Sequence, residues 1–132
     1  MSPEISGEWT RKAEADRIAA LRALEDTLKR KDQAEIACFH AQQAVEKYLK
    51  AIIAHSGRLV PRTHDLRALE LLIKGSPLQL SLTDLRRLNQ FAVEIRYPGS
   101  TATVTEAKQA VSAMRRAVAV CRKRLAGLQR DD

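Results

Sequence analysis

The 132-residue sequence contains few of the residues that interrupt helices or build β-sheets. It has only five glycines and four prolines, and Phe, Trp and Tyr together make up 4% of the chain. Ala, Leu, Arg, Lys, Glu and Gln dominate instead, which favours helices and argues against a β-sandwich. With 45% hydrophobic residues, a chain of this length can bury one core. We therefore predict an all-α fold and a single domain over residues 1–132.

Long apolar runs are also missing, and cysteine is rare. No stretch approaches the roughly 20 apolar residues that span a bilayer, and the N-terminal MSPEISGEWTRK has no signal-peptide core. We expect a cytoplasmic protein with no membrane partner. Cys38 and Cys121 fall on apolar helix faces and have no CxxC neighbour, so we predict two small core residues and no disulfide or zinc site.

Basic residues exceed acidic ones, giving a net charge of +7 and a pI near 9.8. This balance favours an acidic partner such as RNA, DNA or a nucleotide. The cations are spread along the helices, however, and no aromatic residue interleaves the RKR of 122–124 to form a base-stacking platform. A solvated basic surface explains the charge about as well.

Apolar spacing and helix breakers divide the chain into five helices. They are expected to begin near residues 3 or 8, 33, 63, 81 and 103, and the third is short. Ser81 with Asp84, and Thr103 with Glu106, resemble capping boxes. Because short connections favour antiparallel neighbours, we predict an up-and-down antiparallel bundle of four long helices plus one short helix.

Two of these helices have clear apolar stripes. The stripe of the first is Ile18, Leu21, Leu24 and Leu28. The seam of the fifth is Val104, Ala107, Val111, Met114, Val118, Cys121, Leu125 and Leu128. The seam is expected to serve the bundle core, a dimer interface or both.

Polar residues on apolar faces mark candidate sites, because burying them without partners is costly. Gln42 and Asn89 are interpreted first as satisfied core amides. Arg96 projects from the inward side of the fourth helix and has two interpretations. It holds either a phosphate or a carboxylate of the bundle. The candidate carboxylates are Glu14, Glu25 and Asp65.

The opposite face of the second helix contains His40, Gln43, Lys47 and Lys50. These residues form either a groove that binds phosphate or an ordinary solvent-exposed face. His64 lies at a helix start, where it acts as a hydrogen-bonding brace or, less often, as an acid or base. The histidines lack metal-ligand spacing, so we expect no metal site and no cofactor.

The run QQAVEKYLKA (42–51), followed by THDL (63–66) and RYP (96–98), resembles the HEPN domain family over nearly the whole chain. This resemblance implies a five-helix bundle that often dimerises and that works with a small nucleotidyltransferase of the MNT type. Family roles include nucleotide binding, RNA cleavage and toxin activity in toxin–antitoxin pairs.

RNA-cleaving HEPN proteins have an arginine followed, after four to six residues, by a histidine. Arg96 matches the arginine, but the histidine positions are Thr101, Ala102 and Thr103, which cannot transfer protons near neutral pH. Tyr97 can donate a hydrogen bond but does not replace the acid or base.

We therefore expect a non-catalytic HEPN-like module that forms a homodimer and binds a nucleotide, RNA or a partner protein. The expected ligand-binding residues are Arg96, Tyr97, His40, Gln43, Lys47, Lys50 and His64. The alternatives are a metal-independent RNase toxin with a divergent active site and a purely structural dimerisation module.

Overall fold

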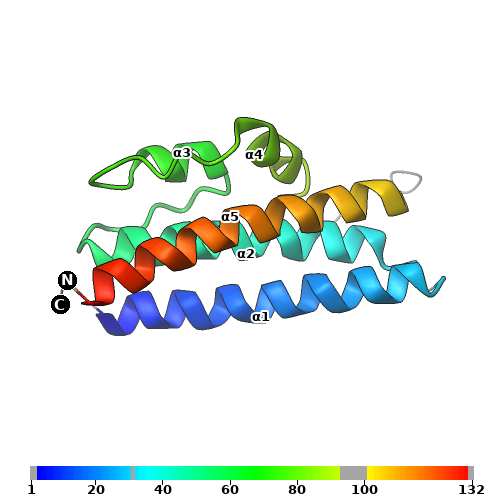
Figure 1. Cartoon of the computed structure of the whole chain (residues 1–132), viewed down its shortest axis with the longest axis horizontal. Coiled ribbons are helices and arrows are strands. Elements are labelled where there is room, and N and C mark those ends of the chain that lie inside the picture. Colours follow the sequence, from blue (N-terminus) through cyan, green and yellow to red (C-terminus); the bar gives the residue numbers. More distant parts are fainter. Residues whose placement is uncertain (1–2, 31, 93–100, 131–132) are drawn as a thin grey trace.

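The computed structural model describes residues 3–30, 32–92 and 101–130, and all regular structure in these ranges is helical. The helices are α1 (Pro3–Leu28), α2 (Ala34–His55), α3 (Leu66–Leu71), α4 (Leu82–Asn89) and α5 (Val104–Arg130). The prediction of an all-α fold with five helices is confirmed. The three long helices α1, α2 and α5 extend along the molecule, and α3 and α4 lie over one side of it (Figure 1).

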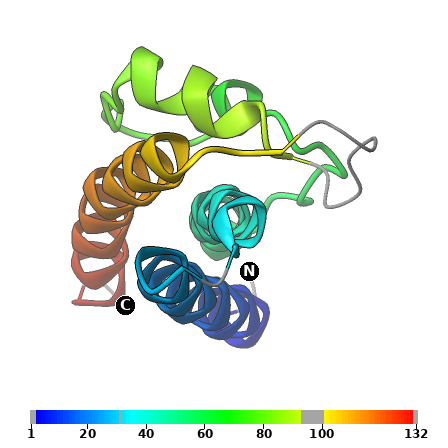
Figure 2. The ribbon, with the colours of Figure 1, turned by 90° about the vertical axis from the view of Figure 1, so that its right-hand side faces the viewer.

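The direction of the chain alternates along the long axis. α1 and α2 are antiparallel, and α5 runs in the same direction as α2, because the segment between α2 and α5, which contains α3 and α4, brings the chain back to the end of the molecule where α2 begins (Figures 1 and 2). The helix expected after Ser81 is shorter than predicted, because α4 has 8 residues and ends at Asn89. Leu85 and Leu88 are buried, whereas Leu82 is 45% exposed. The segment between α2 and α5 therefore contains two short helices and not one long one.

The predicted stripe of α1 is wrong at its ends. Ile18 is 40% exposed and Leu28 is 55% exposed, while the buried stripe of this helix consists mainly of small residues. Its buried members are Ser6, Ala13, Asp16, Ala20, Ala23 and Thr27. The Ser6 hydroxyl donates to the Ala51 carbonyl of α2 at 2.9 Å, a contact that requires the two helices to approach closely. Small side chains allow this approach, and the larger aliphatic residues are left at the edges of the contact.

α2 is the central helix of the core. Most of its side chains are buried, among them Tyr48, Leu49 and Ile53 at 1% exposure or less. The seam predicted for α5 is confirmed from Ala107 to Leu125, which are buried against the same core. Val104, at the start of the seam, is 45% exposed. Cys38 and Cys121 are both buried, as predicted.

Side chains close the first turns of three helices. The Asp65 carboxylate accepts from the amides of residues 67 and 68 at the start of α3. At α5, the Thr103 hydroxyl accepts from the Glu106 amide and the Glu106 carboxylate accepts from the Thr103 amide, both at 3.0 Å, which completes a capping box. At α4 the box is half formed, because Ser81 accepts from the Asp84 amide at 3.2 Å but the Asp84 carboxylate binds Arg116 of α5 instead.

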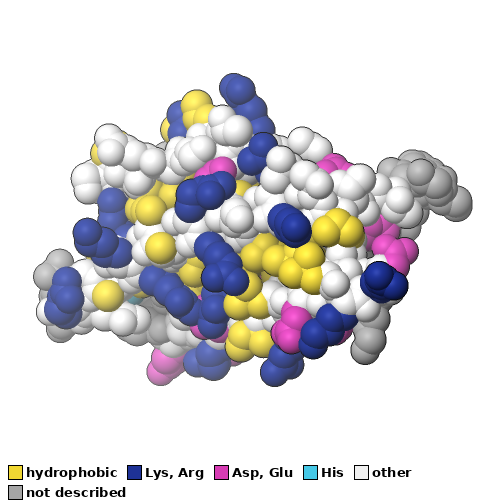
Figure 3. Space-filling view, turned by 45° about the vertical axis from the view of Figure 1, so that its right-hand side comes forward, with side chains coloured by type: hydrophobic (Ala, Val, Ile, Leu, Met, Phe, Trp, Pro, Cys, Tyr) yellow, Lys and Arg dark blue, Asp and Glu magenta, His cyan; other side chains and the backbone are white. Residues whose placement is uncertain are grey.

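Basic residues occur on every helix, as the sequence indicates, but their balance with acidic residues differs between helices. α5 contains seven Lys and Arg residues and a single carboxylate, Glu106, whereas α1 contains six acidic and four basic residues. Lys and Arg side chains gather across the face that includes α5 (Figure 3). None of the helices in the described ranges is long and apolar enough to cross a membrane.

Candidate functional site

Two carboxylates organise the polar residues of α2, and the first is Asp16 of α1. Its Oδ1 is 2.7 Å from Nδ1 of His40, and its Oδ2 is 2.5 Å from Nζ of Lys47. The Asp16 side chain is 9% exposed, and those of His40 and Lys47 are 28% and 23% exposed. Because His40 and Lys47 are two turns apart on α2, one carboxylate of α1 can hold both of them.

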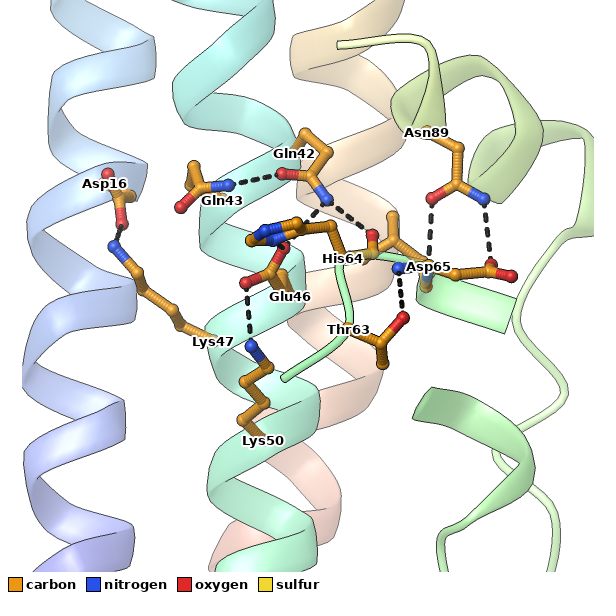
Figure 4. A network of polar contacts seen from close by, with 11 residues as sticks. Asp16, Gln42, Gln43, Glu46, Lys47, Lys50, Thr63, His64, Asp65 and Asn89 are labelled. Carbon is orange, nitrogen blue, oxygen red and sulfur yellow. Dashed lines mark hydrogen bonds and ion pairs between the residues drawn. The ribbon is translucent and has the colours of Figure 1, made fainter. Parts of the chain in front are cut away.

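The second carboxylate is Glu46, which lies on α2 itself (Figure 4). Its Oε1 is 2.9 Å from Nδ1 of His64, and its Oε2 accepts from Nζ of Lys50 at 3.0 Å. The side chains of Glu46 and Lys50 are 4% and 7% exposed, whereas that of His64 is 61% exposed. Glu46 is thus a buried anchor for an imidazole that is open to solvent.

Gln42 joins this anchor to the segment that carries His64. Its side-chain amide donates to Glu46 at 3.2 Å and to the His64 carbonyl at 3.0 Å, and its oxygen accepts from Gln43 at 2.7 Å. Asn89 holds the other side of the segment, donating to Asp65 and accepting from the Leu66 amide, both at 3.1 Å. Both amides have protein partners, which agrees with their interpretation as satisfied amides.

The interpretation that Lys50 lies on a solvent-exposed face is wrong, because its side chain is buried. Its ammonium group is buried between Glu46 and Trp9, 5.4 Å from the centre of the indole ring. The face that the sequence shows as polar is covered by α1 on one side and by the 61–65 segment on the other (Figure 4). Of the residues expected to bind a ligand, His64 is therefore the most exposed in the part of the chain that the structure describes, and His40, Gln43 and Lys47 are partly covered.

Arg96 and Tyr97 lie outside the described residues. The flanks of their segment are described, and both Phe91 and Ala102 are buried. The three carboxylates proposed as internal partners of Arg96 all have other contacts. Glu25 binds Lys29, Asp65 caps α3, and Glu14 binds Arg17.

Glu14 also belongs to a cluster that the sequence did not reveal. Its carboxylate accepts from the Arg17 guanidinium at 3.0 Å, from Nη2 of Arg122 at 2.6 Å and from the Tyr48 hydroxyl, so it joins α1, α2 and α5. Burial raises the pKa of Glu14, but the hydrogen bonds from Arg17, Arg122 and Tyr48 outweigh it and lower the pKa from 4.5 to about 2. Burial and the bond to Glu14 raise the pKa of Tyr48 to about 12. Neither group transfers protons readily near neutral pH, so the cluster is a structural clamp.

The Glu46–His64 pair has a different chemical capacity. A carboxylate that faces Nδ1 accepts its proton and fixes the ring orientation, which leaves Nε2 for a ligand. Protonated, Nε2 donates a charge-assisted hydrogen bond to an anion, and neutral, it accepts a proton. Within the described residues, no group of three or more His, Cys, Asp or Glu side chains could hold a metal ion.

Comparisons with known proteins agree with this architecture. A family model described as the HEPN domain matches residues 6–124. The chain is similar to the crystal structure of ST0689, an archaeal HEPN homologue, with 21% identity, a TM-score of 0.68 and coverage of 90% of this chain and 96% of that chain. It is also similar to TT1696 from Thermus thermophilus, with 22% identity, a TM-score of 0.72 and coverage of 89% and 96%. At these identities the two structures show the fold alone. No curated protein matches the chain.

Proposed function

Because this chain belongs to the HEPN domain family, we propose that it is a binding module for a phosphate-bearing ligand, a nucleotide or RNA, and that it works with a small nucleotidyltransferase. The observation that carries the proposal is the geometry of His64. Its imidazole is held through Nδ1 by the buried Glu46 carboxylate, while the side chain is 61% exposed. Exposed imidazoles oriented in this way are suited to donate to phosphate oxygens.

The surroundings of His64 favour an anion over a neutral ligand. Arg62, two residues before it, is exposed and adds a cation to the same segment. Glu46 does not oppose an anion strongly, because Lys50 and His64 occupy both of its oxygens. Arg96 is also part of this proposal, and its role is supported by the sequence pattern only.

The proposal is tested by titrating the protein with ATP and with adenosine while the imidazole resonances are followed by NMR. We expect ATP to shift the His64 ring signals and adenosine, which lacks phosphate, to leave them unchanged. His64→Ala should abolish ATP binding, whereas Lys74→Ala, at an exposed cation before α4, should not. Equal binding of adenosine, or unchanged ATP affinity in His64→Ala, would contradict a phosphate ligand at His64.

The partner is tested separately. The reading frames beside the gene are searched for a minimal nucleotidyltransferase, which is then co-expressed with the chain, and the mixture is separated by size exclusion with light scattering. A stable complex is expected. If the two proteins elute separately, the two-component part of the proposal is wrong, and the ATP titration is unaffected. A purely structural role predicts dimers or complexes but no response to ATP.

One observation favours a second candidate function, metal-independent RNA cleavage. His64 is an acid–base group of the kind that positions 101–103 lack. In such a reaction the 2′-oxygen attacks phosphorus, its proton passes to a base such as Nε2 of His64, and the 5′-oxygen leaves with a proton from an acid or water. Cleavage of a labelled RNA in EDTA, lost in His64→Ala, would support this activity. Intact RNA after incubation with the pure protein would refute it.

A further inference from the structure

The outward face of α5 has a regular arrangement of cations. Its exposed positions recur with the helical repeat, and the basic residues among them are Lys108, Arg115, Arg116, Arg122, Lys123 and Arg130. Lys108, Arg115 and Arg122 are spaced by seven residues, as are Arg116, Lys123 and Arg130. Seven residues correspond to about 10.5 Å of helix, so the cations form successive levels along one side of α5.

Not all of these charges are available to a partner. Arg116 makes two hydrogen bonds to Asp84, at 2.8 and 2.9 Å, and Arg122 binds Glu14 at 2.6 Å. Lys108, Arg115, Lys123 and Arg130 make no ion pair with any residue in the described ranges. Arg130 is the last residue of α5. We refer to the other three, Lys108, Arg115 and Lys123, as the outer cations.

The residues between the cation levels are small. Ser112, Ala119 and Ala126 are exposed on the same side of α5, so no bulky side chain separates one level from the next. The only acidic residue of the helix, Glu106, is used in the cap at its start. The outward face therefore presents positive charge over most of its length without an opposing carboxylate on the helix.

Two features decide which polyanion this face fits. The apolar side of α5 is buried in the bundle core, so the helix has no free apolar face to insert into a membrane. α5 also has no aromatic residue, so it cannot stack unpaired bases. A row of flexible Lys and Arg side chains without neighbouring aromatic rings is suited to contact phosphates at regular intervals.

We propose that the outer cations of α5 form a contact surface for the phosphate backbone of a nucleic acid, separate from the His64 site. This surface recognises phosphate spacing and not base sequence. It does not depend on His64 binding a nucleotide, and a failure of one proposal leaves the other testable.

The test measures binding of a fluorescein-labelled 20-base-pair RNA duplex by fluorescence anisotropy at several KCl concentrations between about 50 and 200 mM. The logarithm of the binding constant K falls linearly with the logarithm of the salt concentration, and each phosphate contact makes this slope steeper by about 0.9. Replacing all three outer cations (Lys108→Gln, Arg115→Gln and Lys123→Gln) should reduce that slope by about 2 to 3 and weaken binding at least about tenfold. Circular dichroism melting checks that the variant is folded.

A control variant makes the same change in charge elsewhere. Arg11, Arg22 and Lys74 are exposed cations outside α5, and their replacement by Gln should leave the salt slope close to that of the wild type. Equal weakening by the two triple variants would show that net charge alone attracts RNA, which overturns the proposal. Binding to phosphatidylserine vesicles but not to RNA, or no RNA binding at the lowest salt concentration, would overturn it as well.

Discussion

Replacement of Glu14 by glutamine tests the clamp that joins α1, α2 and α5. The change removes the charge that Arg17, Arg122 and Tyr48 share, while it preserves the shape of the side chain. The lowering of the Glu14 pKa from 4.5 to about 2 corresponds to about 3 kcal/mol, at about 1.4 kcal/mol per pKa unit. Because the side chain is 30% exposed, solvent screening reduces this to about 1–2 kcal/mol. We expect Glu14→Gln to lower the free energy of unfolding by that amount at pH 7.

The pH dependence of this loss has a definite sign. The folded state holds Glu14 ionised, so its contribution to stability is fully present above the ordinary pKa of 4.5 and is lost as the pH falls toward about 2. The difference in unfolding free energy between wild type and variant should therefore shrink below pH 4.5, to roughly 40% of its neutral value at pH 3. Urea denaturation followed by far-UV circular dichroism at pH 7, 5, 4 and 3 measures it.

Glu25→Gln provides the matched control on the same helix. Glu25 pairs with Lys29, one turn away, and both side chains are more than 60% exposed. Its replacement should leave stability close to that of the wild type at every pH. Equal effects of the two variants, or an effect of Glu14→Gln that does not change between pH 7 and pH 3, would show that the clamp does not hold the helices together in this way.

The caps, the ion pairs and the core each give one further prediction. Thr103→Ala removes half of the capping box of α5 and should lower the unfolding free energy by about 1 kcal/mol in urea denaturation, while Thr105→Ala, inside the helix and exposed, should have little effect. Asp84→Asn should lower the melting temperature at neutral pH. Because hydrogen bonds from Arg116 lower the pKa of Asp84, the difference in melting temperature from the wild type should diminish in acid. A difference that is independent of pH would contradict this pairing. Burial raises the pKa of the Cys121 thiol to about 12, so Ellman's reagent at pH 8 should label it only after unfolding, and rapid labelling of the native protein would show that it is accessible.

Helix positions were predictable because their signals are local. The reciprocal box of Thr103 and Glu106 depends on residues within one turn, and it forms as the sequence indicates. The seam of α5 was also predictable, since the 3.6-residue repeat fixes which side chains share a face. The length of α4 was not, because its end at Asn89 is fixed by bonds to Asp65 and Leu66, more than 20 residues away.

The candidate site was predictable only in part. The sequence marks His40, Lys47 and His64 as candidate binding residues, but it does not show which carboxylate holds each of them. A helical projection of α2 alone also places Lys50 in water, since it does not include the segments that cover that face. The Tyr48–Arg122 contact spans 74 residues and has no sequence signature.

Local sequence was enough to dictate the helical class, the positions of the breakers and caps, and the apolar face of α5, because each of these depends on neighbours within a few residues. Contacts between distant segments set which polar side chains are buried, which carboxylate holds each histidine, and that small residues of α1 pack against α2. These outcomes depend on how helices far apart in the chain approach one another. Close packing and the requirement that buried polar groups find partners select them, and both operate only in the assembled bundle.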